Sequence, residues 1–230
     1  AAADINGDGD TLDTIIVANA SVTHTTRPGI TSSLTWSVGN HTILGGFWFE
    51  RAKHDQTGTA VRVSADGVPN DYFLQDGKIL RPDGVPYQSR NWKTISTAYQ
   101  AFLQDTFTMM DDRLTFNVGV RTPHIKRDFT NIGNEGFNSG VTYQIEKTYN
   151  DVLPQLGARY KLTADDQLYA SVAKNMKAPP NFVFATTGTN VKLTNGVPSL
   201  VGDVKAETSV NIDVGIRHQT NKWIGSFNVY

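Results

Sequence analysis

Leu114-Thr115-Phe116-Asn117-Val118-Gly119-Val120-Arg121 alternates strictly between apolar and polar side chains. Because successive side chains of a β-strand point to opposite faces, this stretch predicts a strand with one apolar and one polar face. The strands of a soluble β-sandwich also alternate, but they average about 5–6 residues. A strand that crosses a membrane needs about 9–11 residues. The alternating stretches of this sequence run for roughly eight to eleven residues, and their length therefore favours the wall of a barrel.

Four other stretches alternate in the same way. One is residues 30–38, and the apolar positions of the others are Val152, Pro154, Leu156, Ala158, Tyr160 and Leu162, then Val210, Ile212, Val214 and Ile216, then Trp223, Phe227 and Val229. A Lys or Arg facing lipid at the middle of a bilayer costs about 2–4 kcal/mol. None occurs in these apolar sets, which is typical of a face in contact with lipid.

The connections between these stretches alternate between short and long. Short turns are expected at residues 39–40, 110–112, 163–165 and 219–221, and long loops at residues 55–91, 130–149 and 174–207. Outer-membrane barrels place short turns on the periplasmic side and long loops on the extracellular side. Several aromatic residues lie within a few positions of the short turns, as in the girdle of such a barrel: Trp36, Phe107, Phe116, Tyr160, Tyr169 and Trp223. The fold class expected is all-β, a fragment of an antiparallel transmembrane β-barrel with about 8–9 strands.

Composition excludes several classes of protein. The 21 basic and 22 acidic residues give a net charge of −1, so there is no electrostatic footprint for a nucleic acid. The chain has no cysteine, which excludes disulfides and thiolate metal sites. The stretch that begins at Ala1 has neither the charged nor the apolar region of a signal peptide, and the alternation is still running at Tyr230. We therefore expect residues 1–230 to be part of a longer barrel.

Four motifs resemble those of one family, the TonB-dependent receptors. They are Tyr99-Gln100-Ala101-Phe102-Leu103-Gln104-Asp105-Thr106-Phe107 with Asp112-Arg113-Leu114-Thr115, Leu153-Pro154-Gln155-Leu156-Gly157-Ala158-Arg159-Tyr160, Lys177-Ala178-Pro179-Pro180-Asn181-Phe182, and Val204-Lys205-Ala206-Glu207-Thr208-Ser209. They occur in the order typical of the family and cover roughly residues 29–230, with Ala206 where the family usually has proline.

The resemblance implies a large barrel in the bacterial outer membrane, with a plug domain inside it. It implies import of a scarce nutrient, either a siderophore, vitamin B12 or a carbohydrate, driven by the TonB energy-coupling complex. The plug and the remaining strands are absent from residues 1–230. The partners expected are outer-membrane lipid, TonB through the missing N-terminal part, and a small-molecule ligand. A passive porin and a soluble adhesive β-sandwich remain as alternatives.

An Asp/Gly-rich stretch near the start matches several positions of a calcium loop. Asp4, Asn6, Asp8 and Asp10 have the ligand spacing, but Ile15 stands where the bidentate acid is needed. The alternative is a solvated turn, which such residues also favour. Calcium is the one cofactor that the sequence suggests.

Ligand contacts are expected on the long loops, because loops on a rigid scaffold carry recognition. The candidates are Tyr72, Phe73, Arg81, Arg90, Phe182 and Phe184. Arg81 and Arg90 are expected to help to capture an anionic ligand. For each residue the alternative is that it packs the loop. No catalytic constellation accompanies them, so we do not expect an enzyme.

Overall fold

The computed structural model describes residues 9, 16–81, 83–133, 141–186 and 190–230. The elements are β1 (Val17–Asn19), β2 (Val22–Thr26), β3 (Gly29–Val38), β4 (His41–Arg62), β5 (Gln88–Met109), β6 (Leu114–Asn131), β7 (Tyr143–Asn150), β8 (Leu153–Lys161), β9 (Asp166–Lys177), the 3-10 helix η1 (Asn181–Phe184), β10 (Val191–Thr194), β11 (Val197–Leu200), β12 (Glu207–Gln219) and β13 (Ile224–Val229). The all-β prediction is confirmed.

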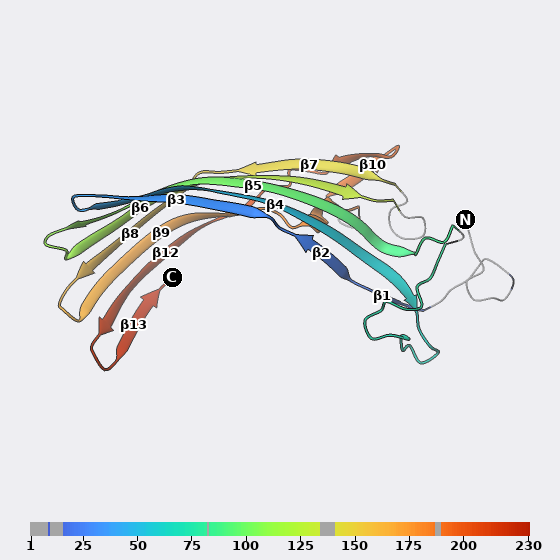
Figure 1. The fold of residues 1–230 in the computed structure, drawn as a ribbon, viewed down its shortest axis with the longest axis horizontal. Coiled ribbons are helices and arrows are strands. Elements are labelled where there is room, and N and C mark those ends of the chain that lie inside the picture. The colour runs from blue at the N-terminus through green and yellow to red at the C-terminus, as the bar shows by residue number, and fades with distance from the viewer. Residues whose placement is uncertain (1–8, 10–15, 82, 134–140, 187–189) are drawn as a thin grey trace.

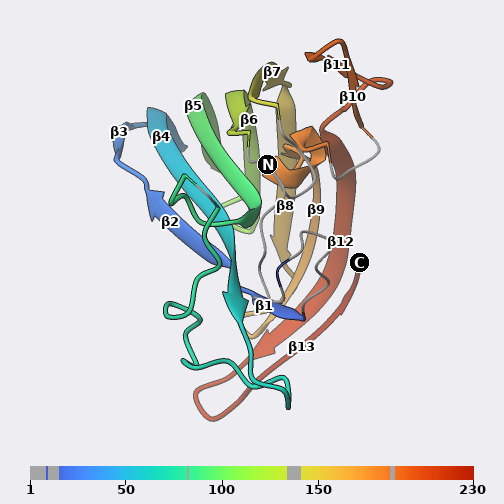
Figure 2. The same ribbon diagram turned by 90° about the vertical axis from the view of Figure 1, so that its right-hand side faces the viewer.

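One antiparallel sheet holds every strand except the β10–β11 hairpin. Because β1, β2 and β3 follow one another along β4, and β7 and β8 follow one another along β6, the sheet has eight positions side by side. The predicted count of about 8–9 strands therefore holds. The sheet is curved into a trough, and within the described residues it does not close on itself, since β13 pairs with β12 alone (Figures 1 and 2).

The hairpins β3–β4, β5–β6, β8–β9 and β12–β13 all turn at one end of the sheet (Figure 1). We call this the short-turn end, and the opposite end the long-loop end. All four short turns lie where the sequence predicts them, within one or two residues.

The register gives the sheet two chemically different faces. Residues directly opposite each other on paired strands share a face. Leu103 pairs with Val120, and Leu156 pairs with Val118, so these apolar residues lie together on what we call the outer face. Gln104 pairs with Gly119, which in turn pairs with Gln155, on the opposite, inner face.

The polarity of both faces reverses near the stacked rings of Tyr99 and His124, whose centroids lie 4.5 Å apart. Beyond this level, toward the long-loop end, the outer face carries charges such as the Lys126–Glu146 ion pair of 2.6 Å. The inner face there includes the buried Phe129 and Ile145 together with Arg127. We call this level the exchange level.

The long connections are shorter than predicted, because β4 to β7 and β9 continue into the stretches that were expected to be loops. They span residues 63–87, 132–142 and 178–206, in place of the predicted 55–91, 130–149 and 174–207. Pairing continues there with a polar outer face, so the lipid type of alternation that defines a strand in the sequence is absent. Before β3, the chain contributes β1 and β2, which pair with this extended part of β4.

Two glycines on the inner face lie beneath aromatic rings of the next strand. Gly46 pairs with Phe102, and Gly215 pairs with Tyr169. A Cβ at Gly46 would stand 2.6 Å from the Ser32 carbonyl, and one at Gly215 would stand 2.7 Å from the Phe227 carbonyl, with the ring in contact in each case. Glycine therefore makes room for a ring to lie flat across the sheet.

Candidate functional site

The inner face between the short turns and the exchange level carries a hydrogen-bonded polar layer. Gln155 Nε2 donates to Gln104 Oε1 at 3.0 Å, and Asn117 Nδ2 donates to Thr106 Oγ1 at 2.9 Å. Each bond links different strands, so the layer connects β5, β6 and β8. Such a face is suited to contact with water rather than with lipid.

Two arginines stand above this layer on β6. Arg121 Nη2 donates to Asn175 Oδ1 on β9 at 3.1 Å. Arg127 donates through Nη1 to Asn181 Oδ1 of η1. Among the described residues, the buried Nε atoms of Arg121 and Arg127 meet no hydrogen-bond partner. Burial lowers the pKa of the Arg127 guanidinium, which still leaves it cationic at neutral pH. The two guanidinium groups therefore place positive charge on the inner face.

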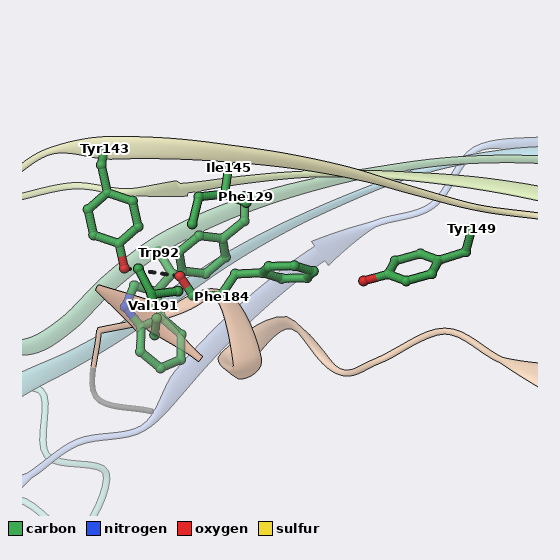
Figure 3. Packing of buried hydrophobic residues seen from close by; sticks show 8 residues of the cluster. Trp92, Phe129, Tyr143, Ile145, Tyr149, Phe184 and Val191 are labelled. Atoms are coloured by element: carbon green, nitrogen blue, oxygen red, sulfur yellow. Dashed lines mark hydrogen bonds between the residues drawn. The ribbon is translucent and has the colours of Figure 1, made fainter. Parts of the chain in front are cut away.

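An apolar cluster closes the inner face at the long-loop end. Side chains of β5, β6 and β7 meet the connection between β9 and β12, which we call the strap (residues 178–206). Its buried members are Trp92, Phe129, Tyr143, Ile145, Tyr149, Phe184, Ala185 and Val191. Figure 3 shows Phe129 and Tyr143 extending from the sheet toward Phe184 on the strap, and the ring centroids of Phe129 and Phe184 lie 6.1 Å apart. The strap is thus packed against the trough.

One tyrosine hydroxyl fixes the strap to the sheet. Tyr143 Oη donates to the Phe184 carbonyl at 3.0 Å and accepts the Thr186 N–H at 2.9 Å. Burial raises the pKa of Tyr143 above its ordinary value, so this hydroxyl keeps its proton over the physiological range.

We predict that Tyr143→Phe loosens the strap selectively. Removing the hydroxyl takes this partner from the buried Phe184 carbonyl and from the partly buried Thr186 N–H, at a cost of about 1–3 kcal/mol. Hydrogen exchange at the Thr186 amide should accelerate accordingly, while exchange in β12 stays unchanged. The matched control is Tyr72→Phe, because Tyr72 is 91% exposed. Equal exchange at Thr186 in both variants would remove the anchoring role.

The ligand candidates of the loop at residues 63–87 occupy different settings. Tyr72 and Phe73 are both exposed and meet edge to face, with centroids 5.6 Å apart. The Asp71 carboxylate organises their turn, because it accepts hydrogen bonds from the backbone N–H groups of Gln75 and Phe73. These hydrogen bonds lower the pKa of Asp71. Arg81 forms a 2.8 Å ion pair with Asp83 within the same loop.

The three remaining ligand candidates, Arg90, Phe182 and Phe184, also differ in their exposure and in their contacts. Arg90 donates to Ser21, and its guanidinium lies 5.7 Å from the ring centroid of Trp92. Phe182 is 59% exposed, but Phe184 is fully buried in the apolar cluster and packs the strap. Exposure therefore leaves Tyr72, Phe73 and Phe182 open to a ligand, and the structure does not place Arg81 and Arg90 on a common partner.

The sequence reasoning did not single out Arg121 and Arg127 as functional residues. Arg121 has a signal in the sequence, because it is the last polar residue of the alternation that begins at Leu114. Arg127 lies six residues further along β6, on the same face. Continuing the period of two past the apolar band would have identified both.

The calcium candidate Asp4, Asn6, Asp8 and Asp10 lies outside the described residues. In the part of the chain that is described, no three His, Cys, Asp or Glu side chains gather to hold a metal ion. Over the same residues, no helix is long and apolar enough to cross a membrane.

Comparison with known proteins gives one family. The family model described as "TonB dependent receptor-like, beta-barrel" matches residues 3–230. No curated protein matches the sequence. The fold is similar to that of the unliganded ferric citrate transporter FecA, with a TM-score of 0.64 and 17% identity over 91% of this chain and 27% of that one.

Two other solved structures are similar. The ferric yersiniabactin uptake receptor FyuA from Yersinia pestis gives a TM-score of 0.57 and 20% identity over 89% of this chain and 27% of that one. The siderophore receptor PiuA from Acinetobacter baumannii gives 0.55 and 15% over 87% of this chain and 30% of that one. At these identities the likeness shows the fold, and the chain spans less than a third of the length of each protein.

Proposed function

The chain belongs to the family of TonB-dependent receptor β-barrels, and on that premise we propose that it forms part of the wall of a bacterial outer-membrane importer. The outer face would contact lipid, and the inner face would line the lumen. The short turns would lie in the periplasm, and the long loops with the strap outside the cell. The plug and the other strands would come from the rest of the receptor, and TonB would act through that missing part.

The reversal of polarity at the exchange level is the observation that carries this proposal. On β6 the apolar outer set begins at Leu114, and the reversal follows at His124. At about 3.3 Å per residue and a tilt of about 40°, this length spans roughly 25 Å. The apolar band of an outer-membrane barrel is about 25 Å tall. A soluble sandwich would instead need two sheets packed face to face, whereas all eight positions here form one sheet.

We propose that the imported ligand is anionic, of the ferric siderophore class. Support comes from the positive charge that Arg121 and Arg127 place on the inner face. Among the similar structures, FyuA is a ferric yersiniabactin uptake receptor, FecA is a ferric citrate transporter and PiuA is a siderophore receptor. The exposed Tyr72, Phe73 and Phe182, with Arg81 and Arg90, would contribute first contacts at the mouth.

The double variant Arg121→Ala/Arg127→Ala of the complete receptor should bind an anionic ferric chelate at least about tenfold more weakly, because a hydrogen bond to a charged group contributes about 1.5–3 kcal/mol. Titration calorimetry with the purified receptor measures this. The control is Arg51→Ala, which removes one arginine charge from the outer face, where Arg51 pairs with Thr97. If Arg121→Ala/Arg127→Ala binds the chelate as tightly as Arg51→Ala does, the proposed anion site on the inner face is wrong. The heat-dependent shift of the folded barrel on a gel serves as the folding check. A variant that has lost this shift is misfolded, and a variant that keeps it has lost binding alone.

A further inference from the structure

Two cations stand directly opposite each other on the inner face, where the strap packs against the sheet. Arg127 of β6 pairs in register with Lys147 of β7. Like charges in directly opposite positions on paired strands are destabilising. The strap supplies an acceptor to each of them, because Asn181 accepts a hydrogen bond from Arg127 and Asp203 Oδ1 lies 3.1 Å from Lys147 Nζ. These strap groups therefore offset a repulsion that the sheet itself does not relieve.

A hollow of about 230 Å³ lies between the end of β7 and residues 203–206, where the strap leads into β12. Its cations are Lys147 and Lys205. Its apolar wall is formed by Tyr149, Val204 and Ala206. The Asp203 carboxylate bridges the two lysines, since its Oδ2 lies 3.6 Å from Lys205 Nζ. The hollow thus already holds a carboxylate that belongs to the chain.

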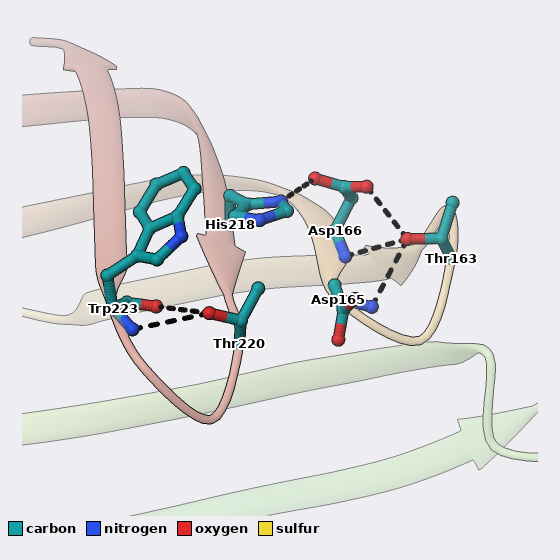
Figure 4. Close-up of polar contacts among 6 residues, drawn as sticks. All are labelled: Thr163, Asp165, Asp166, His218, Thr220 and Trp223. Atoms are coloured by element: carbon teal, nitrogen blue, oxygen red, sulfur yellow. Dashed lines mark hydrogen bonds and ion pairs between the residues drawn. The ribbon is translucent and has the colours of Figure 1, made fainter.

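The Asp203 carboxylate is held loosely in comparison with another carboxylate of the same sheet. Asp166 at the short-turn end has both oxygens engaged: His218 Nδ1 lies 2.6 Å from Oδ1, and Thr163 Oγ1 donates to Oδ2 at 2.8 Å (Figure 4). The Asp203 side chain is 58% exposed, against 32% for Asp166. Ion pairs as exposed as those of Asp203 contribute little to stability. An external anion can therefore displace Asp203.

Displacement of Asp203 would leave a strongly cationic site. Arg127, Lys147 and Lys205 each carry a positive charge, and the Arg127 partner Asn181 is neutral. Over the described part of the chain, Asp203 is the one carboxylate that forms an ion pair with any of these three cations. The hydrogen bond from Lys147 lowers the pKa of Asp203, so its carboxylate is ionised at neutral pH. The group that bridges the lysines shows that a carboxylate fits their spacing.

We propose that this hollow is a subsite for a carboxylate group of the imported ligand, and that Asp203 occupies it as an internal competitor until the ligand arrives. The ligand carboxylate takes the place of Asp203 on Lys147 and Lys205. Arg127, directly opposite Lys147, adds positive charge to the site. This inference rests on the proposed function, because it names the carboxylate as an anionic group of that ligand. Capture of the ligand also frees the end of the strap from β7.

The test is calorimetric titration of the complete purified receptor with tricarballylate, a soluble tricarboxylate. Asp203→Asn removes the competitor and should tighten binding by about threefold to fivefold, the range expected for the loss of an exposed ion pair. Lys147→Met/Asp203→Asn should abolish this gain, because the incoming carboxylate then lacks its cation. The matched control is Glu146→Gln, which removes the same charge one residue away on the outer face, where Glu146 pairs with Lys126. The control should bind as the wild type does.

The outcomes separate this subsite from the proposed function. A gain in Asp203→Asn that is absent from Glu146→Gln and from the double variant supports the subsite. Three results would overturn it: no gain in Asp203→Asn, an equal gain in Glu146→Gln, or a gain that survives in Lys147→Met/Asp203→Asn. Each of them leaves the importer proposal standing, which the titration of Arg121→Ala/Arg127→Ala with a ferric chelate tests separately. Loss of chelate binding in that variant, together with no gain in Asp203→Asn, would retain the inner-face anion site and remove the competitor.

Discussion

An arginine in place of Val214 should destabilise the folded receptor in a bilayer by about 2–4 kcal/mol. Val214 is exposed on the outer face near the middle of β12, where it pairs with Ala170 and Val229. No side chain in these pairs can neutralise the new charge, which would be held in hydrocarbon. Urea unfolding of the complete receptor in liposomes, followed by tryptophan fluorescence, measures the change.

The control for Val214→Arg is Asp213→Arg, one residue away on the inner face, where Asp213 pairs with Ser171. A lumen-facing arginine remains in water, so we expect a change within about 0.5 kcal/mol. Equal destabilisation by both substitutions would mean that the two faces of β12 have the same surroundings, which contradicts a wall between lipid and lumen.

Phe184→Ala should release the strap from the sheet while the barrel remains folded. Removing a fully buried phenylalanine ring costs about 3–5 kcal/mol, and Phe184 is the strap residue that reaches Phe129 and Tyr143. This cost falls on the local opening of residues 178–206. Limited proteolysis should therefore cut the strap much faster, with an unchanged heat-modified gel shift of the barrel.

Phe182→Ala is the matched control, because Phe182 belongs to the same 3-10 helix and is 59% exposed. Its removal should leave the cleavage rate of the strap nearly unchanged. If Phe182→Ala accelerates cleavage as much as Phe184→Ala does, the strap is not anchored through the apolar cluster.

The alternation from Leu114 to Arg121 predicted the wall correctly, because one face of such a strand must be continuously apolar. The short turns were also predicted, since Gly39-Asn40 and Thr163 to Asp165 interrupt the alternation with turn-forming residues. Beyond the exchange level the same strands bury their inner side against the strap and expose charges outside. A search for one continuously apolar face does not detect strands whose outer face is charged. For this reason the sequence predicts loops for the residues of β4, β5 and β7 that lie beyond the exchange level.

The candidate site was less accessible to prediction, for a related reason. Phe182 and Phe184 have the same chemistry two positions apart, and only the packing of the strap makes one exposed and the other buried. Arg127 becomes significant because η1, more than fifty residues later, brings Asn181 to it. Contacts that are made across such separations leave no local pattern in the sequence.

The most direct test of the central claim is the accessibility of single cysteines along β6 in the complete receptor within liposomes. This chain has no cysteine of its own, so each label in it is unique. Nitroxide labels at Phe116, Val118 and Val120 should be relaxed by oxygen, and labels at Thr115 and Asn117 by a water-soluble nickel complex. At Lys126 and Asp128 the outer face should become accessible to nickel. Accessibility without a period of two, or with oxygen favoured at Thr115 and Asn117, would contradict a barrel wall with lipid on its outer face.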